Sequence, residues 1–130
     1  MYERRTRDVV VRVEPEFLNE QSSDADDRYI WAYTVEIENQ TSDDMQVVER
    51  FWQITDRNGQ VQEVRGEGVV GEKPSLKPGE VFRYTSGAPL SAPSGVMLGT
   101  YQVQTPDGKR FDVEIPAFSL DSPFEARSIN

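Results

Sequence analysis

The sequence predicts an all-β protein, and three features of its 130 residues support that prediction. Apolar and polar side chains alternate with a period of two over several segments, which is typical of a sheet with one buried face. Nine glycines and eight prolines are spread between those segments. No stretch of about ten residues keeps the 3.6-residue apolar period of an amphipathic helix.

The two strands nearest the N-terminus show the alternation most clearly. Over residues 9–14, every second side chain is a valine, and over residues 29–38 the alternating residues are Tyr29, Trp31, Tyr33, Val35 and Ile37. Five further segments with weaker alternation lie at residues 46–55, 61–65, 80–85, 96–105 and 111–118. The sequence therefore predicts about seven strands, with Trp31 and Trp52 in the core.

Short polar segments separate these strands in the manner of antiparallel hairpins. Asn58-Gly59 and Asp107-Gly108 are pairs that favour a type I′ turn, in which both central residues have positive φ. Seven short antiparallel strands with regular turns indicate a two-sheet β-sandwich of the fibronectin type III or immunoglobulin-like kind. An eight-stranded barrel is the alternative.

The length suits a single domain over residues 1–130, because domains usually contain about 100–150 residues. The predicted strands place the ordered core at about residues 8–121. We expect the N-terminal leader, with Arg4, Arg5 and Arg7, and the C-terminal tail after Asp121 to be flexible. The polar segment at residues 19–27 is predicted to be a mobile loop.

Composition excludes several classes of function. With 23 acidic and 14 basic residues the formal charge is −9, so nucleic acid and anionic membranes would be repelled. The chain has no histidine and no cysteine, which excludes a Ser-His-Asp triad, a thiolate nucleophile and the usual zinc sites. No segment has the apolar run of a signal peptide or a membrane helix, so we expect a cytoplasmic protein.

A glycine motif is the most conspicuous candidate site. Gly66, Gly68 and Gly71 satisfy G-x-G-x-x-G, which in dinucleotide-binding proteins opens a helix whose N-terminus holds the pyrophosphate. Pro74 and Pro78 follow, and both oppose a helix at this point. We interpret the glycines as residues of a loop that needs positive φ and close backbone approach. Binding of a small anion such as pyrophosphate remains the alternative.

Acidic residues do not form a recognisable catalytic or metal site. Asp24, Asp26 and Asp27 lie close together, but they lack the spacing of an EF-hand loop. No carboxylate pair stands in an apolar context that would raise a pKa for glycoside hydrolysis. The sequence therefore predicts no catalytic residue, no cofactor and no metal.

The nearly uncharged segment at residues 85–95 is predicted to be a long loop between two strands. Long ordered loops on a rigid sandwich are common sites for partner binding, and an edge strand near residues 61–65 offers a second surface. The candidate partner-binding residues are therefore Gly66, Gly68, Gly71, Thr85, Ser86, Gly87 and Pro89.

Several of these segments are similar to the ApaG family. The resemblance is carried by Arg50-Phe51-Trp52-Gln53-Ile54-Thr55-Asp56, by Gly-Glu-Gly-Val-Val-Gly at residues 66–71, by Tyr84-Thr85-Ser86-Gly87, and by residues 29–35, 95–101 and 111–118. It covers about residues 8–121. The resemblance implies a fibronectin III-like sandwich of seven antiparallel strands and no established catalytic residue.

The same resemblance implies protein–protein contact, because related domains occur in eukaryotic F-box-type and polymerase-interacting proteins. It also implies a link with tolerance of Co²⁺ and Mg²⁺, which a chain without a membrane span would influence only indirectly. We therefore expect a non-catalytic protein-interaction module with an unidentified protein partner. Anion binding at residues 66–71 and the cation-tolerance role are the alternatives.

Overall fold

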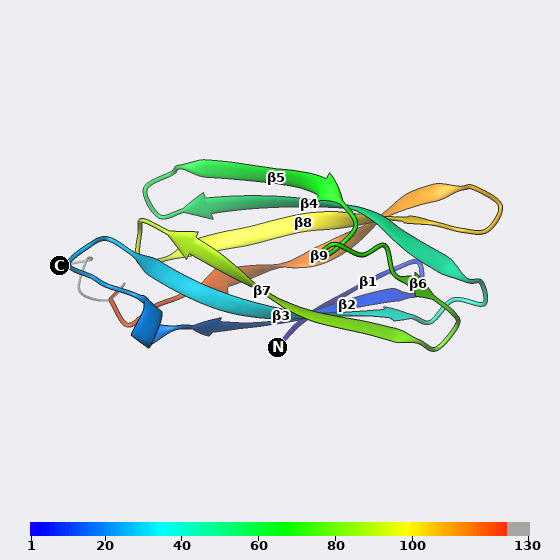
Figure 1. Cartoon of the computed structure of the whole chain (residues 1–130), viewed down its shortest axis with the longest axis horizontal. Helices are drawn as coiled ribbons and strands as arrows, with labels where there is room; N and C mark the ends of the chain where they lie inside the picture. Colours follow the sequence, from blue (N-terminus) through cyan, green and yellow to red (C-terminus); the bar gives the residue numbers. More distant parts are fainter. Residues whose placement is uncertain (125–130) are drawn as a thin grey trace.

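Two antiparallel β-sheets stack face to face in the structure, a computed structural model that describes residues 1–124 (Figure 1). Nine strands and one short 3₁₀ turn, η1 (Asn19–Gln21), make up the regular elements of these residues. The predicted all-β sandwich is confirmed, and a strand lies at each of the seven predicted positions. The two additional strands are β1 (Tyr2–Thr6) at the N-terminus and the two-residue β6 (Ser75–Leu76).

The first sheet has the strand order β1-β2-β3-β7. Its strands are β1 (Tyr2–Thr6), β2 (Val9–Phe17), β3 (Tyr29–Asn39) and β7 (Val81–Leu90). Strand β3 alternates strictly between buried and half-buried residues along its whole length. This pattern shows that one face of the sheet packs on the core, as the sequence predicts.

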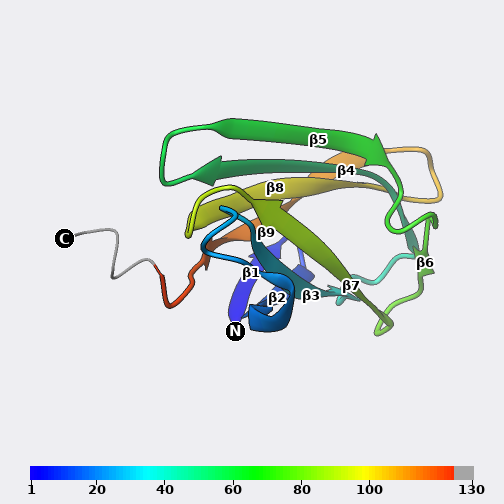
Figure 2. The same ribbon diagram turned by 60° about the vertical axis from the view of Figure 1, so that its left-hand side comes forward.

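The second sheet has the order β5-β4-β8-β9, with β6 paired to β4 beside that path. Its strands are β4 (Met45–Asp56), β5 (Val61–Glu67), β6 (Ser75–Leu76), β8 (Gly95–Gln104) and β9 (Arg110–Leu120). The β5 end of this sheet lies on the same side of the molecule as the β7 end of the first sheet (Figure 2).

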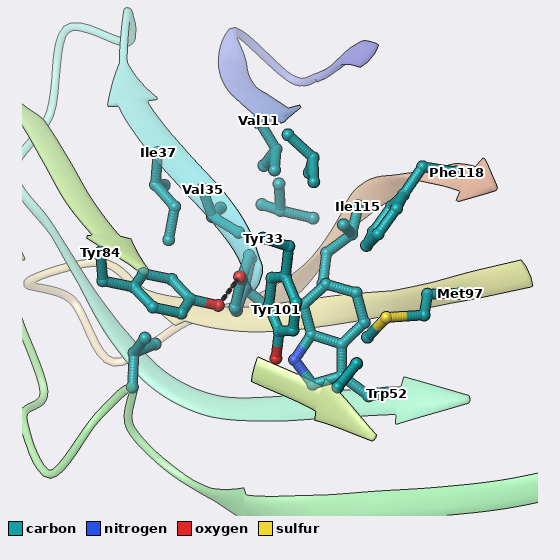
Figure 3. Close-up of a cluster of buried hydrophobic side chains, with 14 of the residues drawn as sticks. Val11, Tyr33, Val35, Ile37, Trp52, Tyr84, Met97, Tyr101, Ile115 and Phe118 are labelled. Carbon is teal, nitrogen blue, oxygen red and sulfur yellow. Dashed lines mark hydrogen bonds between the residues drawn. The ribbon is translucent and has the colours of Figure 1, made fainter. Parts of the chain in front are cut away.

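Aromatic side chains from both sheets fill the core. Trp31 and Trp52 are buried, which confirms their predicted place. The ring of Trp52 lies edge-on to Tyr33 and to Phe118, with centroid distances of 5.2 and 5.9 Å (Figure 3). Buried aromatic rings in such tilted contacts are each worth about 0.5–1.5 kcal/mol beyond their area. The core therefore spans the two sheets as one continuous cluster.

A β-bulge in β4 determines which of its side chains face this core. The register with β8 shifts between Val47 and Glu49, so that Val48 is an extra residue. Beyond the bulge, Trp52 and Ile54 are buried, and Arg50 lies on the same inner face by alternation. The bulge thus brings one arginine to the inner face of the sandwich.

Strand β1 lies in the segment that the sequence predicts to be a flexible leader, and it seals one side of the sandwich. Residues 2–6 pair with β2, and the Thr6 hydroxyl accepts a hydrogen bond from the Glu114 amide of β9 at 3.1 Å. Tyr2 packs on Phe118 with a centroid distance of 5.9 Å. Arg5 pairs with Asp8 at 3.2 Å, so the basic cluster is part of an ordered hairpin.

The hairpin turns differ from the predicted type I′ at both Asn-Gly and Asp-Gly. Only Gly59 and Gly108 have positive φ there, and the bonds Asp56 N to Gln60 O and Thr105 N to Lys109 O enclose three residues each. Three-residue loops that end in a left-handed glycine have this pattern. The sequence pair alone does not distinguish the two turn types, because glycine fits both.

The polar segment at residues 19–27, which the sequence predicts to be a mobile loop, contains the turn η1 and several hydrogen bonds. Ser22 Oγ donates to Leu18 O at 2.8 Å and accepts from the Ile30 amide at 2.9 Å. Beyond Asp121, Phe124 packs on Phe17 with a centroid distance of 6.3 Å. The rest of the predicted flexible tail, residues 125–130, lies outside the described residues.

Tyr84 and Tyr101 join the two sheets near the side that carries β5 and β7. Their hydroxyl groups hydrogen-bond each other inside the core (Figure 3). Burial raises the pKa of both phenols above the ordinary tyrosine value. Each hydroxyl therefore stays protonated in the folded protein at a pH where an exposed tyrosine would ionise.

We expect the free energy of unfolding to fall as the pH rises above about 10. The unfolded chain releases its phenolic protons near that ordinary value, whereas the folded Tyr84 and Tyr101 retain theirs. The contribution is fully present below about pH 10 and is lost above it. Urea unfolding followed by tryptophan fluorescence between about pH 8 and 11.5 measures this loss. A Tyr84→Phe/Tyr101→Phe double variant should lose less stability over the same interval, and an equal loss in both proteins would contradict the assignment.

Candidate functional site

The side of the sandwich bounded by β5 and β7 is called the open side here. The opposite side is sealed by contacts between β1 and β9, whereas β5 and β7 are not hydrogen-bonded to each other (Figure 2). The open side contains all the candidate residues predicted from the sequence, from the glycine motif to residues 85–89. The open side is therefore the candidate functional site.

Each of the three glycines of the motif is required for a different steric reason. A Cβ at Gly66 would lie 2.9 Å from the guanidinium of Arg50, which crosses β5 at this point. A Cβ at Gly68 would lie 2.1 Å from the carbonyl oxygen of Glu72. Gly71, with φ +81°, is a central residue of the turn closed by Val69 and Glu72. The motif thus serves local backbone geometry.

The backbone amides of the glycine turn are largely used within the chain. Gly68 N donates to Val48 O at 2.8 Å, and Val69 and Glu72 exchange two hydrogen bonds of 2.7 and 2.9 Å. A phosphate cradle needs such amides free and aimed at the ligand. The segment that follows contains the strand β6 and no helix. The glycine turn therefore lacks the main features of a dinucleotide-binding loop.

Arg50 is the functional candidate that the sequence interpretation did not identify. Its Nη1 donates to Glu67 O at 3.0 Å and to Gly68 O at 3.2 Å. Within residues 1–124, none of the ion pairs includes Arg50. A half-buried guanidinium without a carboxylate partner is a place where an acidic group of a ligand would be stabilised.

Three tyrosine hydroxyl groups lie close enough to Arg50 for its charge to affect their pKa. Burial raises the pKa of Tyr33, while a hydrogen bond with Ser86 and the positive charge of Arg50 act in the opposite direction. The charge of Arg50 also lowers the pKa of Tyr84 and Tyr101 against the larger effect of burial. One arginine beside tyrosine and serine hydroxyl groups is suited to binding an anionic group.

The predicted loop at residues 85–95 is mostly strand, and that prediction is wrong. Thr85, Ser86, Gly87 and Pro89 all lie in β7 and pair with β3, so the connection to β8 contains only residues 91–94. Ser86 faces inward beside Tyr33, and the Thr85 hydroxyl bonds that of Thr34 at 2.9 Å on the outer face. The sequence signal for a strand here was the alternation of apolar residues at Tyr84, Ala88 and Leu90, which are buried in the structure. The prolines and glycines of the segment obscured that signal.

Pro89 is compatible with this strand because β7 is the last strand of its sheet. Asn39 N donates to Glu80 O, so residues 82, 84, 86, 88 and 90 form the bonded pairs with β3 and Pro89 faces away from it. A proline is tolerated in a sheet where its absent N–H would point to solvent. The free edge of β7 therefore runs along the open side.

The acidic residues form local turns and no metal site in the described part of the chain. Within residues 1–124, no group of three or more acidic residues is arranged to hold an ion. Asp26 accepts a hydrogen bond from Ser23 Oγ at 3.0 Å, and Asp56 Oδ1 accepts from the amides of Asn58 and Gln60. These carboxylates stabilise turns of the backbone.

Comparison with known proteins assigns this architecture to a family. The model of the ApaG domain matches residues 19–105. The protein ApaG of Rhizobium etli is 55% identical over 130 residues, which is the full length of both chains. The chain belongs to the ApaG family. The resemblance stated from the sequence is therefore confirmed.

Solved structures agree with the ApaG assignment. The ApaA protein of Bordetella pertussis has 49% identity and a TM-score of 0.86, over 89% of this chain and 94% of that one. A protein of Archaeoglobus fulgidus, with 7% identity and a TM-score of 0.54 over 85% and 95% of the two chains, shows only that the fold recurs. The ApaG match includes Arg50, the glycine turn and β7.

Membrane insertion through a helix is not supported for this ApaG domain. The described residues contain no helix with the length and apolar character of a transmembrane span. The regular elements are strands, apart from the short turn η1.

Val70 at the tip of the glycine turn is predicted to be strained in this ApaG domain. Its φ is +45°, a conformation that costs an L-residue about 1–2 kcal/mol, and its side chain is 54% exposed. Val70→Asn creates the Asn-Gly pair that suits a type I′ turn. We expect a stability gain of about 1 kcal/mol in urea unfolding. Val61→Asn, at an exposed position without positive φ, is the control and should give no gain; a gain in both would contradict the strain.

Proposed function

We propose that this ApaG domain is a non-catalytic protein-interaction module that takes an extended segment of a partner protein along the free edge of β7. One observation carries the proposal: β7 ends its sheet on the open side with a row of backbone groups that no other strand uses. Addition of a strand to an exposed sheet edge is a common mode of peptide recognition.

The bonding pattern specifies which groups would receive the segment. Residues 82, 84, 86, 88 and 90 bond β3, so the N–H groups of Val81, Arg83, Thr85 and Gly87 point away from the sheet. Pro89 has no N–H and ends this row of donors. The edge therefore offers four donors over seven residues, from Val81 to Gly87, enough for a short extended peptide.

The chemistry around the edge supports binding rather than catalysis. Neither histidine nor cysteine occurs in the chain, and Arg50 with its neighbouring hydroxyls supplies a charge without a base. Side chains on the inner face of an added strand would point toward the open side, where Arg50 forms no ion pair within residues 1–124. We therefore propose a partner segment that carries an acidic side chain.

The alternatives from the sequence receive less support from the geometry. Pyrophosphate binding at residues 66–71 would need free backbone amides, and those of Gly68 and Val69 already bond Val48 and Glu72. For the role in Co²⁺ and Mg²⁺ tolerance, residues 1–124 contain no cluster of acidic side chains that could hold such an ion. A cytoplasmic location stays a prediction from the sequence.

Removal of a single edge donor should abolish partner binding without loss of the fold. Thr85→Pro removes an outward N–H at a position equivalent to that of Pro89, whereas Thr85→Val keeps the N–H and removes only the hydroxyl. Quantitative affinity capture from native lysate with the three proteins as bait measures the effect, and circular dichroism checks folding. We expect proteins captured by the wild type to be retained by Thr85→Val and lost by Thr85→Pro. Equal capture by all three would contradict recognition at β7.

A further inference from the structure

Strand β5 is the second free edge of the open side, and it is more exposed than β7. It pairs only with β4, and nearly all of its residues are exposed on both faces of the strand. Val61 is 55% exposed and Val64 is 41% exposed. Figure 1 shows β5 at the outer end of the second sheet, beyond β4. Exposed valines on an uncovered edge strand are a liability unless another chain covers them.

The outward groups of β5 follow from two hydrogen bonds at its ends. Asp56 N bonds Gln60 O, and Gly68 N bonds Val48 O, so residues 62, 64 and 66 form the bonded pairs with β4. The N–H and C=O groups of Val61, Glu63, Arg65 and Glu67 therefore point away from the sheet, and of these the Glu67 carbonyl already accepts a hydrogen bond from Arg50 Nη1 at 3.0 Å. Their side chains lie on the outer face of the sheet, and that of Val64 lies on the inner face.

We propose that β5 pairs antiparallel with β5 of a second copy of this chain around a two-fold axis at Val64. Glu63 of each copy then lies directly opposite Arg65 of the other, and Val61 lies opposite Glu67. Glu63 and Arg65 form bonded pairs in this register, and so do Val61 and Glu67, where the Glu67 carbonyl uses the lone pair that Arg50 leaves free. The two Val64 side chains meet at the axis, and one continuous sheet runs through both copies.

Charge complementarity favours a second copy of this chain as the partner of β5, and it favours this register. The sequence Glu63-Val64-Arg65 places opposite charges symmetrically about Val64, so the two-fold pairing creates two Glu–Arg pairs on one face. A register centred on Glu63 would oppose Glu63 to itself, and one centred on Arg65 would oppose Arg65 to itself. Like charges directly opposite are destabilising. The alternative registers are therefore disfavoured by the same two residues.

Both charged side chains are already held on the outer face. Arg65 lies over the ring of Phe51 at 4.6 Å, and Glu63 accepts a hydrogen bond from Gln53 at 3.2 Å. The first sheet does not cover β5, because Gln62 and Val64 on its inner face are exposed. A second copy can therefore approach along the edge without displacing β7.

The edge of β7 lacks these properties and is not an equivalent site for a second copy. Its outward residues include Gly87 and Pro89, and its outward charge, Arg83, has no acidic residue to meet on a second β7. Self-association through β5 is therefore independent of the proposed partner site on β7. Failure of one proposal leaves the other standing, because the two use different strands.

Charge reversal tests the pairing with the full-length protein. Seven paired residues bury less than a standard interface, so we expect a reversible dimer that sedimentation velocity resolves between about 10 and 500 µM. Glu63→Arg and Arg65→Glu each turn two attractive pairs into repulsive ones, and each should raise the dissociation constant at least roughly tenfold. The double variant Glu63→Arg/Arg65→Glu restores opposite charges and should regain dimerisation.

Mixing the two single variants gives the sharpest result. Glu63→Arg and Arg65→Glu cannot pair with themselves, but together they form two opposite-charge pairs and should form a heterodimer. Arg83→Glu has the same net charge as Arg65→Glu but changes β7, so it should dimerise like the wild type. With Glu63→Arg it makes one attractive and one repulsive pair, so that heterodimer should be weaker than the one between Glu63→Arg and Arg65→Glu. A wild type that stays monomeric, single variants that dimerise normally, or a double variant that fails to recover would each overturn the proposal.

Discussion

The β-bulge at Val48 is the constraint on which the open side depends. With strict alternation from Val47, the residues that face the core would be 49, 51 and 53, and Trp52 would point outward. The extra residue reverses this phase, so that Trp52 and Ile54 are buried. The same reversal brings Arg50 onto the inner face. The bulge therefore buries Trp52 and Ile54 and at the same time turns the charged side chain of Arg50 toward the core. Because burial of a charge is costly, the Arg50 guanidinium has to lie at the edge of the sandwich.

The glycine turn provides the space and the hydrogen-bond acceptors that the Arg50 side chain needs. Arg50 crosses β5 where Gly66 has no side chain, and its guanidinium satisfies the carbonyls of Glu67 and Gly68. Gly68 then turns beneath Glu72, and the chain reverses at Val70 and Gly71. These contacts explain a G-x-G-x-x-G spacing without a nucleotide. They also leave β5 and β7 apart, so two sheet edges remain unpaired on one side, while β1 and β9 seal the other.

Period-two alternation was sufficient to predict the sandwich, the seven main strands and the buried tryptophans. It failed where local composition masks a strand: Gly87 and Pro89 resemble loop residues, although the free edge of β7 accepts both. Strand β1 was missed because its exposed residues show no apolar alternation and its order comes from pairing with β2 and from contact with β9. Arg50 was not predicted as a site residue, since its inward position follows from a bulge that no single-residue pattern marks.

The edge of β7 is free in the isolated domain, and residue-resolved amide hydrogen exchange measures this freedom strand position by strand position. The amides of Phe82, Tyr84, Ser86 and Ala88 bond β3, whereas those of Val81, Arg83, Thr85 and Gly87 face solvent. In dilute protein the first set should exchange roughly a hundredfold or more slowly than the second, in strict alternation along the strand. Equal protection of both sets would show that another part of the chain covers the edge, and would contradict the account.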